Sequence, residues 1–124
     1  MKSLHILHAE AAAGWGGQEI RVLQESLLLL ERGHRVSLVC QADSPLEKRA
    51  RSISNSRFHL IPISMKSALS LWVFLTLYCY VSKNNLDVIH THSSVDSWLG
   101  GVVGKLSGVP VIRTRHVSLP VNDF

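Results

Sequence analysis

The stretch HAEAAAGWGGQEIRVL, residues 8–23, joins a short aliphatic segment to a long leucine-rich one through a turn crowded with glycine. The segment before it, residues 4–8, has the composition expected of a β-strand. After it, apolar residues recur every three or four positions from Ile20 to Leu30, which predicts a helix with one buried face, and Gly33 is a suitable stop. The stretch therefore predicts a strand, a glycine-rich turn and a helix in succession.

Strand-like and helix-like patterns alternate along the rest of the chain, which is typical of α/β proteins. The segments with strand composition are residues 4–8, 35–40, 58–63, 87–92 and 109–114. Because helical stretches separate them, we expect the strands to be parallel and joined by right-handed crossovers. The sequence therefore predicts an α/β fold, a Rossmann-like parallel sheet of about five strands with helices on both faces.

Several helices carry signals for where they start and how they pack. Ser44, Pro45 and Glu47 have the order of an N-cap, a first helical residue and a capping carboxylate. In the last predicted helix, glycines are expected to let the backbone approach the sheet closely; they are Gly100, Gly101 and Gly104. Residues 68–81 are continuously apolar but fall short of the roughly 20 residues needed to cross a bilayer. That helix is expected either to pack on the sheet and a neighbouring helix or to lie in a membrane surface.

Composition indicates one folded domain but does not select its partner. The chain has 124 residues, of which 46% are hydrophobic. Its net charge of +4 permits attraction to phosphorylated substrates, anionic lipid or nucleic acid. The basic segment 47–57 is most simply a solvated helix face, with attraction to anionic lipid or a phosphorylated acceptor as the alternative. Cys40 and Cys79 lack metal-binding and disulfide spacing, so we expect free, buried thiols in a reducing cytoplasm.

The predicted fold says where a ligand would bind. In an open parallel sheet, ligands bind beyond the carboxyl ends of the strands, near the point where the strand order reverses. Three polar segments follow predicted strands there, namely residues 9–19, 91–96 and 113–118. We expect them to form one site in space.

The glycine turn has the chemistry of an anion site. A helix that begins near Gly17 exposes its first amide N–H groups and the positive end of its dipole, and glycine leaves room for a phosphate. The dinucleotide fingerprint G-x-G-x-x-G fails, because its third glycine is replaced by Glu19, and no Walker loop follows. We interpret Glu19 as a first-turn carboxylate favoured by the helix dipole. The alternative for the glycines is a turn that requires positive φ angles.

Three segments together resemble the N-terminal domain of the family 4 retaining glycosyltransferases, whose two-domain fold is the GT-B type. The segments are GWGGQEIRVLQESLLLLERGHRVSLVC at 14–40, DVIHTHS at 87–93 and VPVIRTRH at 109–116. The resemblance runs from Met1 to about His116 and implies that residues 1–124 form the acceptor-side domain. It also implies that sugar is transferred, with retention, in the cleft between this domain and a C-terminal donor-binding domain.

The resemblance also implies roles for individual residues. Gly16 and Gly17 would present backbone amides to the donor diphosphate. His116 would be the catalytic residue that contacts the donor sugar near the reacting centre. From the residues themselves we expect the acceptor side to be lined by Trp15, His92, Ser93 and Arg115. Packing against the helix end is the alternative for Trp15, and contact with phosphate is the alternative for Arg115.

The chain also departs from the family pattern, because the donor domain has no counterpart before the sequence ends at Phe124. We therefore expect no sugar transfer by this chain alone, and a missing C-terminal domain or a separate partner chain to complete the enzyme. The expected ligands are a nucleotide sugar, which is a substrate and not a cofactor, and a glycan or lipid-linked acceptor. No metal is expected: His90 and His92 share a strand face, but no Cys or carboxylate is spaced to complete a site, so we interpret them as strand-end or acceptor-lining residues.

Two other function classes stay open from the residues alone. One is a non-catalytic Rossmann-type nucleotide-binding or regulatory module. The other is a basic nucleic-acid-binding domain, which is disfavoured because the basic residues are not interleaved with aromatic ones, so no nucleic acid is expected as a partner. We expect the protein in the cytoplasm, with peripheral association with the inner face of the membrane as a further option.

Overall fold

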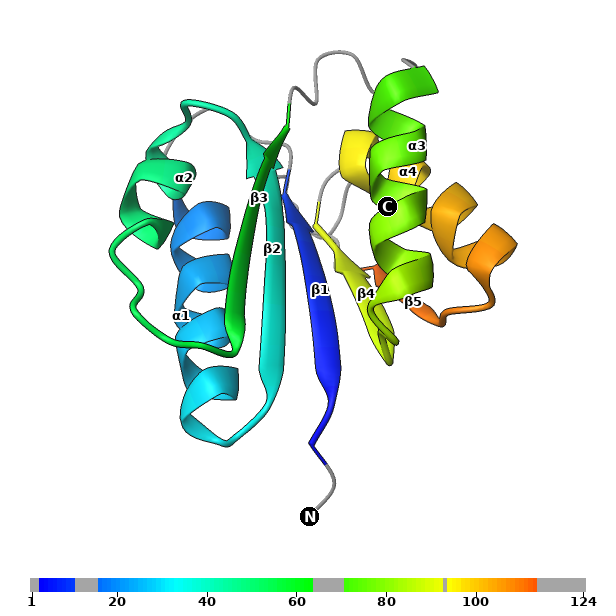
Figure 1. The fold of residues 1–124 in the computed structure, drawn as a ribbon. Helices are drawn as coiled ribbons and strands as arrows, with labels where there is room; N and C mark the ends of the chain where they lie inside the picture. The colour runs from blue at the N-terminus through cyan, green and yellow to red at the C-terminus, as the bar shows by residue number, and fades with distance from the viewer. Residues whose placement is uncertain (1–2, 11–15, 64–70, 93, 114–124) are drawn as a thin grey trace, which may run out of the picture.

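The computed structural model describes residues 3–10, 16–63, 71–92 and 94–113, and these form a sheet covered by helices (Figure 1). Along the chain the elements are β1 (His5–Glu10), α1 (Gly17–Glu31), β2 (Arg35–Gln41), α2 (Pro45–Ala50), β3 (Phe58–Ile63), α3 (Leu71–Lys83), β4 (Val88–Thr91), α4 (Ser94–Ser107) and β5 (Val111–Arg113). This order confirms the predicted alternation. The strand ends differ from the prediction by at most two residues: β1 continues to Glu10 instead of residue 8, and β5 begins at Val111 instead of residue 109.

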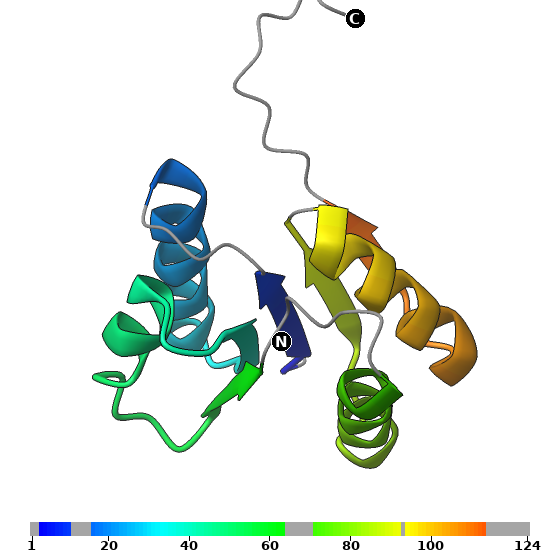
Figure 2. The same ribbon diagram turned by 90° about the horizontal axis from the view of Figure 1, so that it is seen from above.

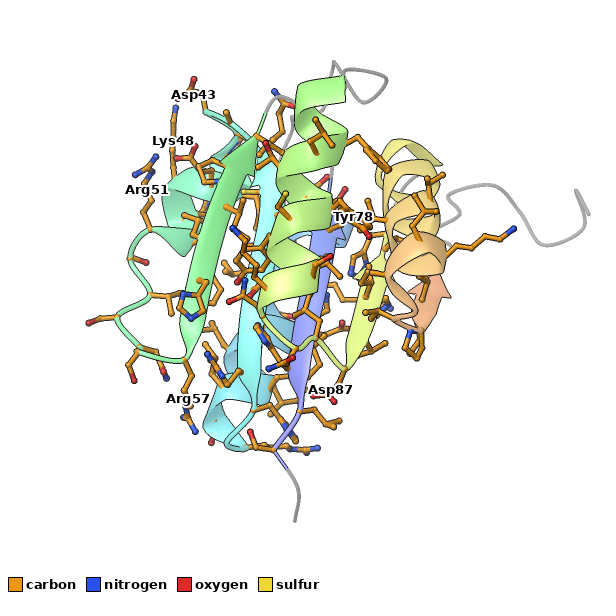
Figure 3. The ribbon with its side chains drawn as sticks, turned by 45° about the vertical axis from the view of Figure 1, so that its right-hand side comes forward. Asp43, Lys48, Arg51, Arg57, Tyr78 and Asp87 are labelled. Atoms are coloured by element: carbon orange, nitrogen blue, oxygen red, sulfur yellow. The ribbon has the colours of Figure 1, made fainter. Side chains whose placement is uncertain are left out.

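The sheet has the order β3-β2-β1-β4-β5, and every pairing in it is parallel. β1 lies at the centre, with Ile6 aligned to Val36 of β2 and to Val88 of β4. Asp87, next to the first residue of β4, sits at the amino end of the strands (Figure 3), where its carboxylate accepts a hydrogen bond of 2.7 Å from the His5 N–H. The predicted Rossmann-like fold is confirmed, and the strand order reverses between β1 and β4.

Two hydrophobic cores lie on opposite faces of the sheet. Figure 2 shows α1 and α2 on one face and α3 and α4 on the other. The buried core under α1 and α2 consists of Val22, Leu38, Cys40, Leu46 and Ala50. The buried core under α3 and α4 consists of Leu7, Ala9, Val39, Leu77, Val81, Leu86, Ile89 and Val103. Because side chains alternate along a strand, β2 contributes to both cores, with Val39 in one and Leu38 and Cys40 in the other. The core residues of β1, Leu7 and Ala9, both lie under α3 and α4.

The predicted helix ends are present. Gly33 has φ +90, and the chain turns there through hydrogen bonds from Gly33 N to Leu30 O and from His34 N to Leu29 O, a Schellman motif. At the start of α2, the Ser44 hydroxyl accepts the Glu47 N–H. The signals read from sequence therefore correspond to real backbone hydrogen bonds.

The basic segment is largely solvated. Lys48 and Arg49 are exposed, and Arg51 forms an ion pair with Glu47 one turn earlier. Figure 3 shows Lys48 and Arg51 at the outer edge of the molecule. Arg57 instead donates from Nη2 to the Leu30 carbonyl at 2.8 Å, so it supports the carboxyl end of α1.

The apolar helix α3 packs on the sheet and on α4, through Leu77 and Val81 in the core and Phe74 and Tyr78 beside it. Within the described residues, none of the helices has both the length and the apolar character needed to cross a bilayer. The prediction of two buried thiols is wrong for one of them: Cys40 is buried and Cys79 is exposed. Cys79 lies on the side of α3 turned away from Leu77 and Val81, next to the exposed Thr76 and Leu75.

A chain of hydrogen bonds connects α3 to the two central strands. His5 Nδ1 lies 3.0 Å from the Asn84 carbonyl and must donate to it, so His5 Nε2 accepts from the Ser37 hydroxyl at 2.7 Å. The Ser37 oxygen then accepts from the Tyr80 hydroxyl. Burial lowers the pKa of His5, because a charged ring would be poorly solvated there.

Only one of the two glycines of α4 whose surroundings are described makes the close approach that the sequence suggests. A Cβ on Gly104 would lie 2.3 Å from Val111 Cγ2 and 3.0 Å from the Val109 carbonyl oxygen. A Cβ on Gly101 would meet nothing within 4 Å. Gly104 therefore lets α4 lie against β5, whereas Gly101 does not serve this purpose.

We expect Gly104→Ala to lower the free energy of unfolding by about 1–3 kcal/mol, the usual cost of overpacking. Gly101→Ala, in the same helix, should leave it unchanged or raise it, because alanine is the better helix former. Urea unfolding of both variants tests this, and equal effects at the two positions would contradict it.

Candidate functional site

The carboxyl ends of β1 and β4 meet where the strand order reverses, at the top of the sheet in Figure 1. Gly16 and Gly17, at the start of α1, come after β1 in the chain, and His92 directly follows β4. Arg113, the last residue of β5, is aligned with Thr91 of β4. The structure therefore brings parts of all three predicted site segments to one edge of the sheet, which is where open α/β sheets bind ligands.

The start of α1 is organised by Glu19. Its carboxylate accepts the Gly16 N–H at 2.7 Å, and the first helical hydrogen bond runs from Ile20 N to the Gly16 carbonyl. Glu19 is 7% exposed. This is one half of a capping box, because Gly16 has no side chain to complete the other half. The interpretation of Glu19 as a carboxylate of the first helical turn is confirmed.

The glycines at this helix start are not there for positive φ angles. Gly16 has φ −152 and ψ −165, an extended conformation open to any residue, so that alternative is wrong for Gly16. Gly17 begins the helix, is exposed, and a Cβ on it would meet no protein atom within 4 Å. What Gly17 provides is unobstructed access to the amide end of α1.

Three histidines gather on the face of the sheet that α1 covers. His8 of β1 is aligned with His90 of β4, and His92 follows two residues later. Ring centroids are 5.1 Å apart for His8 and His90, 5.2 Å for His8 and His92, and 4.2 Å for His90 and His92. His8 Nδ1 and His92 Nε2 share a hydrogen bond of 2.9 Å. The predicted acceptor residue His92 thus has a buried side chain that bonds to a residue of β1.

His8 is held neutral by its surroundings. It is 1% exposed, and burial together with the nearby His90 lowers its pKa to about 3. Its Nε2 atom has no hydrogen-bond partner among the described residues. A carboxylate is also near: one ligand atom each from His8, Glu25, His90 and His92 can be chosen so that all lie within 4.8 Å of one another.

Sequence reasoning missed His8 and Glu25 as members of this cluster. For His8 a signal existed, because the strands on either side of the reversal are neighbours and both carry histidine near their carboxyl ends. Glu25 lies on α1, and its distance from β4 depends on how the helix rotates on the sheet. The other predicted site residues lie outside the described residues: Trp15, Ser93, Arg115 and His116.

An open pocket of about 420 Å³ lies elsewhere, between the carboxyl half of α1 and the segment that leads into β3. It is lined by Leu23, Leu27, Leu30, Glu31, Arg49, Ser52, Ile53, Ser54 and Asn55. The lining includes no residue of β1, β4 or β5, neither glycine of the α1 start and not His92, so the pocket is not part of the candidate site.

The neutral state of His8 predicts a pH dependence of folding. Its pKa is about 3 when folded and 6.5 in the reference state, so its contribution to stability is complete above pH 6.5 and is lost as the pH falls. For this one group, the unfolding free energy should fall by up to about 1.4 kcal/mol for each unit by which the pH is lowered below 6.5. A chelator keeps metal ions away from the histidines during the measurement. His5 adds to the loss in the same direction.

His8→Asn, which keeps a polar atom near the position of Nδ1 but does not titrate, should flatten the dependence measured by urea unfolding between pH 7 and pH 5. The exposed His59 offers a matched control, His59→Asn. An unchanged pH dependence in His8→Asn would show that His8 is not buried as a neutral ring.

Comparison with known proteins places this chain in a family. The sequence profile described as Glycosyltransferase Family 4 matches residues 15–123. The chain is 29% identical to a UDP-Gal:alpha-D-GlcNAc-diphosphoundecaprenol alpha-1,3-galactosyltransferase of Escherichia coli, over 94% of this chain and 32% of that enzyme. It therefore spans about a third of the length of this relative.

Solved glycosyltransferases share its fold. One from Rickettsia africae has a TM-score of 0.75 at 20% identity, over 98% of this chain and 32% of its own. MurG of Acinetobacter baumannii has a TM-score of 0.72 at 16% identity, over 97% of this chain and 38% of its own. The sheet is that of the N-terminal half of a GT-B fold, and with a family profile matching most of its length the chain belongs to glycosyltransferase family 4.

Proposed function

We propose that this chain is the acceptor-side domain of an enzyme that transfers a sugar, with retention, from a nucleotide-sugar donor to a lipid-linked or glycan acceptor. The observation that carries the proposal is the open amide end of α1 at Gly17, placed at the strand-order reversal of a family 4 domain. Family membership favours this function over a regulatory nucleotide-binding module or a nucleic-acid-binding domain.

The donor diphosphate would bind at the start of α1. By helix geometry the N–H groups of Gly17, Gln18 and Glu19 precede the first helical hydrogen bond and point out of the helix end. Glu19 brings a negative charge to this end, which offsets part of the helix dipole. A diphosphate would therefore need further cations, and Arg113 at the end of β5 is one candidate. With Arg113 supplying that positive charge, we propose transfer without a metal at the diphosphate.

The acceptor side rests on similarity. The Escherichia coli relative is named for an acceptor linked to diphosphoundecaprenol, which is a lipid. We propose an acceptor of this class, lined by Trp15, Ser93 and Arg115, with His116 beside the donor sugar. His92 is left out of this lining, because its side chain is buried and bonded to His8. Because the chain spans about a third of that relative, the donor-binding part would come from further sequence or from a partner chain.

Gly17→Ala tests the donor site. The substitution meets no protein atom, so folding should be unaffected, but its methyl group would obstruct a phosphate at the amides. In the assembled enzyme we expect the KM for the nucleotide sugar to rise roughly 10- to 100-fold, because a hydrogen bond to a charged group contributes about 1.5–3 kcal/mol. His116→Ala should instead lower kcat, since its contact is proposed at the reacting centre.

Gly101→Ala is the matched control for Gly17→Ala, because it adds the same methyl group to another helix where nothing lies within 4 Å. Steady-state kinetics and thermal melting would be measured for all three variants. A Gly17→Ala enzyme with wild-type donor KM would refute the diphosphate site, and loss of activity only in proportion to loss of folded protein would refute both assignments.

A lipid-linked acceptor implies contact with a membrane surface, and we propose that the exposed side of α3 makes it, in the cytoplasm. Leu75 is exposed there, and Lys83 is in the last turn of the helix. The chain should sediment with anionic vesicles at low salt and less at high salt, because such attraction is screened over about 8 Å at physiological ionic strength. Leu75→Glu should reduce sedimentation, whereas Leu28→Glu, on a helix of the opposite face, should not. Equal sedimentation of the two variants would argue against α3 as the contact.

A further inference from the structure

The histidine cluster under α1 has the composition of a metal site. His8 comes from β1, His90 and His92 come from β4 and the residue that follows it, and Glu25 comes from α1. Each offers one ligand atom, and these atoms lie within 4.8 Å of one another. In a tetrahedral zinc site, with ligand bonds of about 2.0–2.1 Å, neighbouring ligand atoms are about 3.3–3.4 Å apart.

A second observation points to a ligand at this place. Two neutral imidazoles can share only one hydrogen bond, and His8 forms its bond to His92 through Nδ1. The other ring nitrogen of His8 therefore needs a different partner. Its Nε2 is buried and has no partner among the residues that the structure describes. Buried polar atoms without a partner are rare and costly, and a missing ion is one of their common explanations.

We propose that His8, His90, His92 and Glu25 bind a Zn²⁺ ion that ties α1 to β1 and β4. Imidazole nitrogen and carboxylate oxygen are ligands that Zn²⁺ prefers, and three histidines with one carboxylate complete a four-coordinate site. Metal binding requires neutral imidazoles, and the buried His8 offers the ion its Nε2 atom, which has no other partner among the described residues. His90 and Glu25 are partly exposed, so an ion can enter from their side.

This ion would stabilise the packing of α1 on the sheet and would take no part in the transfer reaction. Glu25 lies eight residues after Gly17, which is about 12 Å along the helix at 1.5 Å per residue. The ion is therefore separate from the helix end at which we propose diphosphate binding. It would fix the position of α1 on the sheet, and with it the position of that helix end.

The proposal departs from the expectation of no metal, which considered the spacing within one strand alone. His90 and His92 supply two ligands, and no nearby Cys or carboxylate has a spacing that suggests a complete site. The third and fourth ligands come from β1 and α1, more than 60 residues earlier in the chain. Only the parallel pairing of β1 with β4 brings them together.

The test uses the 124-residue chain without a polyhistidine tag, freed of metal by a chelator and dialysed. Titration calorimetry with Zn²⁺ at neutral pH should show saturable binding of one ion per chain, and thermal melting should shift upward by several degrees. Co²⁺ should bind the same site and give a visible absorption band, and both signals should weaken as the pH falls.

Variants distinguish the residues that bind Zn²⁺ from residues that do not. Glu25→Gln and His90→Ala, both at partly exposed positions, should weaken Zn²⁺ binding at least tenfold, about the minimum effect seen even for residues that only support a ligand. His59→Ala, which removes an exposed histidine of β3, should bind as the wild type does. Absence of binding to the folded metal-free chain would overturn the proposal. So would wild-type affinity in both Glu25→Gln and His90→Ala, because the ion would then lie elsewhere.

Discussion

The parallel pairing of β1 with β4 is the constraint on which the candidate site depends. It is the pairing at which the strand order reverses, and the helices that follow the two strands, α1 after β1 and α4 after β4, cover opposite faces of the sheet (Figure 2). The same pairing aligns His8 with His90 and holds the His5 amide against the Asp87 carboxylate. A slip of one residue would turn every one of these side chains to the other face of the sheet. The register of β1 resists such a slip, because Leu7 and Ala9 face the apolar core under α3 and α4, and a slip would bury His8 and Glu10 there instead.

Features set by residues close together in the sequence could be predicted, whereas features set by contacts between distant segments could not. Local signals were sufficient for the α/β class, the bounds of β3, the stop at Gly33 and the cap at Ser44, since each depends on residues a few positions apart. The resemblance of three ordered motifs was sufficient for the family. The exposure of Cys79 was not predictable from an apolar run, because which side of α3 faces the sheet is decided by packing against α4 and the strands.

The site itself was predicted in its location and not in its contacts. In a parallel sheet the carboxyl ends of all strands lie at one edge. The sequence was therefore enough to predict that Gly16, Gly17 and His92 lie at that edge. The bond between His92 and His8, and the approach of Glu25, depend on strand register and helix rotation, which no local pattern carries. The conformation of Gly16 was also out of reach, because glycine is compatible with extended and left-handed backbone alike.

The two cysteines differ in exposure, so their thiols differ in how readily they react with oxidants. Burial raises the pKa of the Cys40 thiol to about 12, so it holds its proton and is shielded from reagents, whereas Cys79 stands on the outer side of α3. The thiolate is the reactive form, so an oxidant or alkylating agent meets Cys79 first. Oxidation would then join two molecules through α3 and not close a loop within one. A single reporter group attached at Cys79 would thus lie on the same surface that we propose faces the lipid.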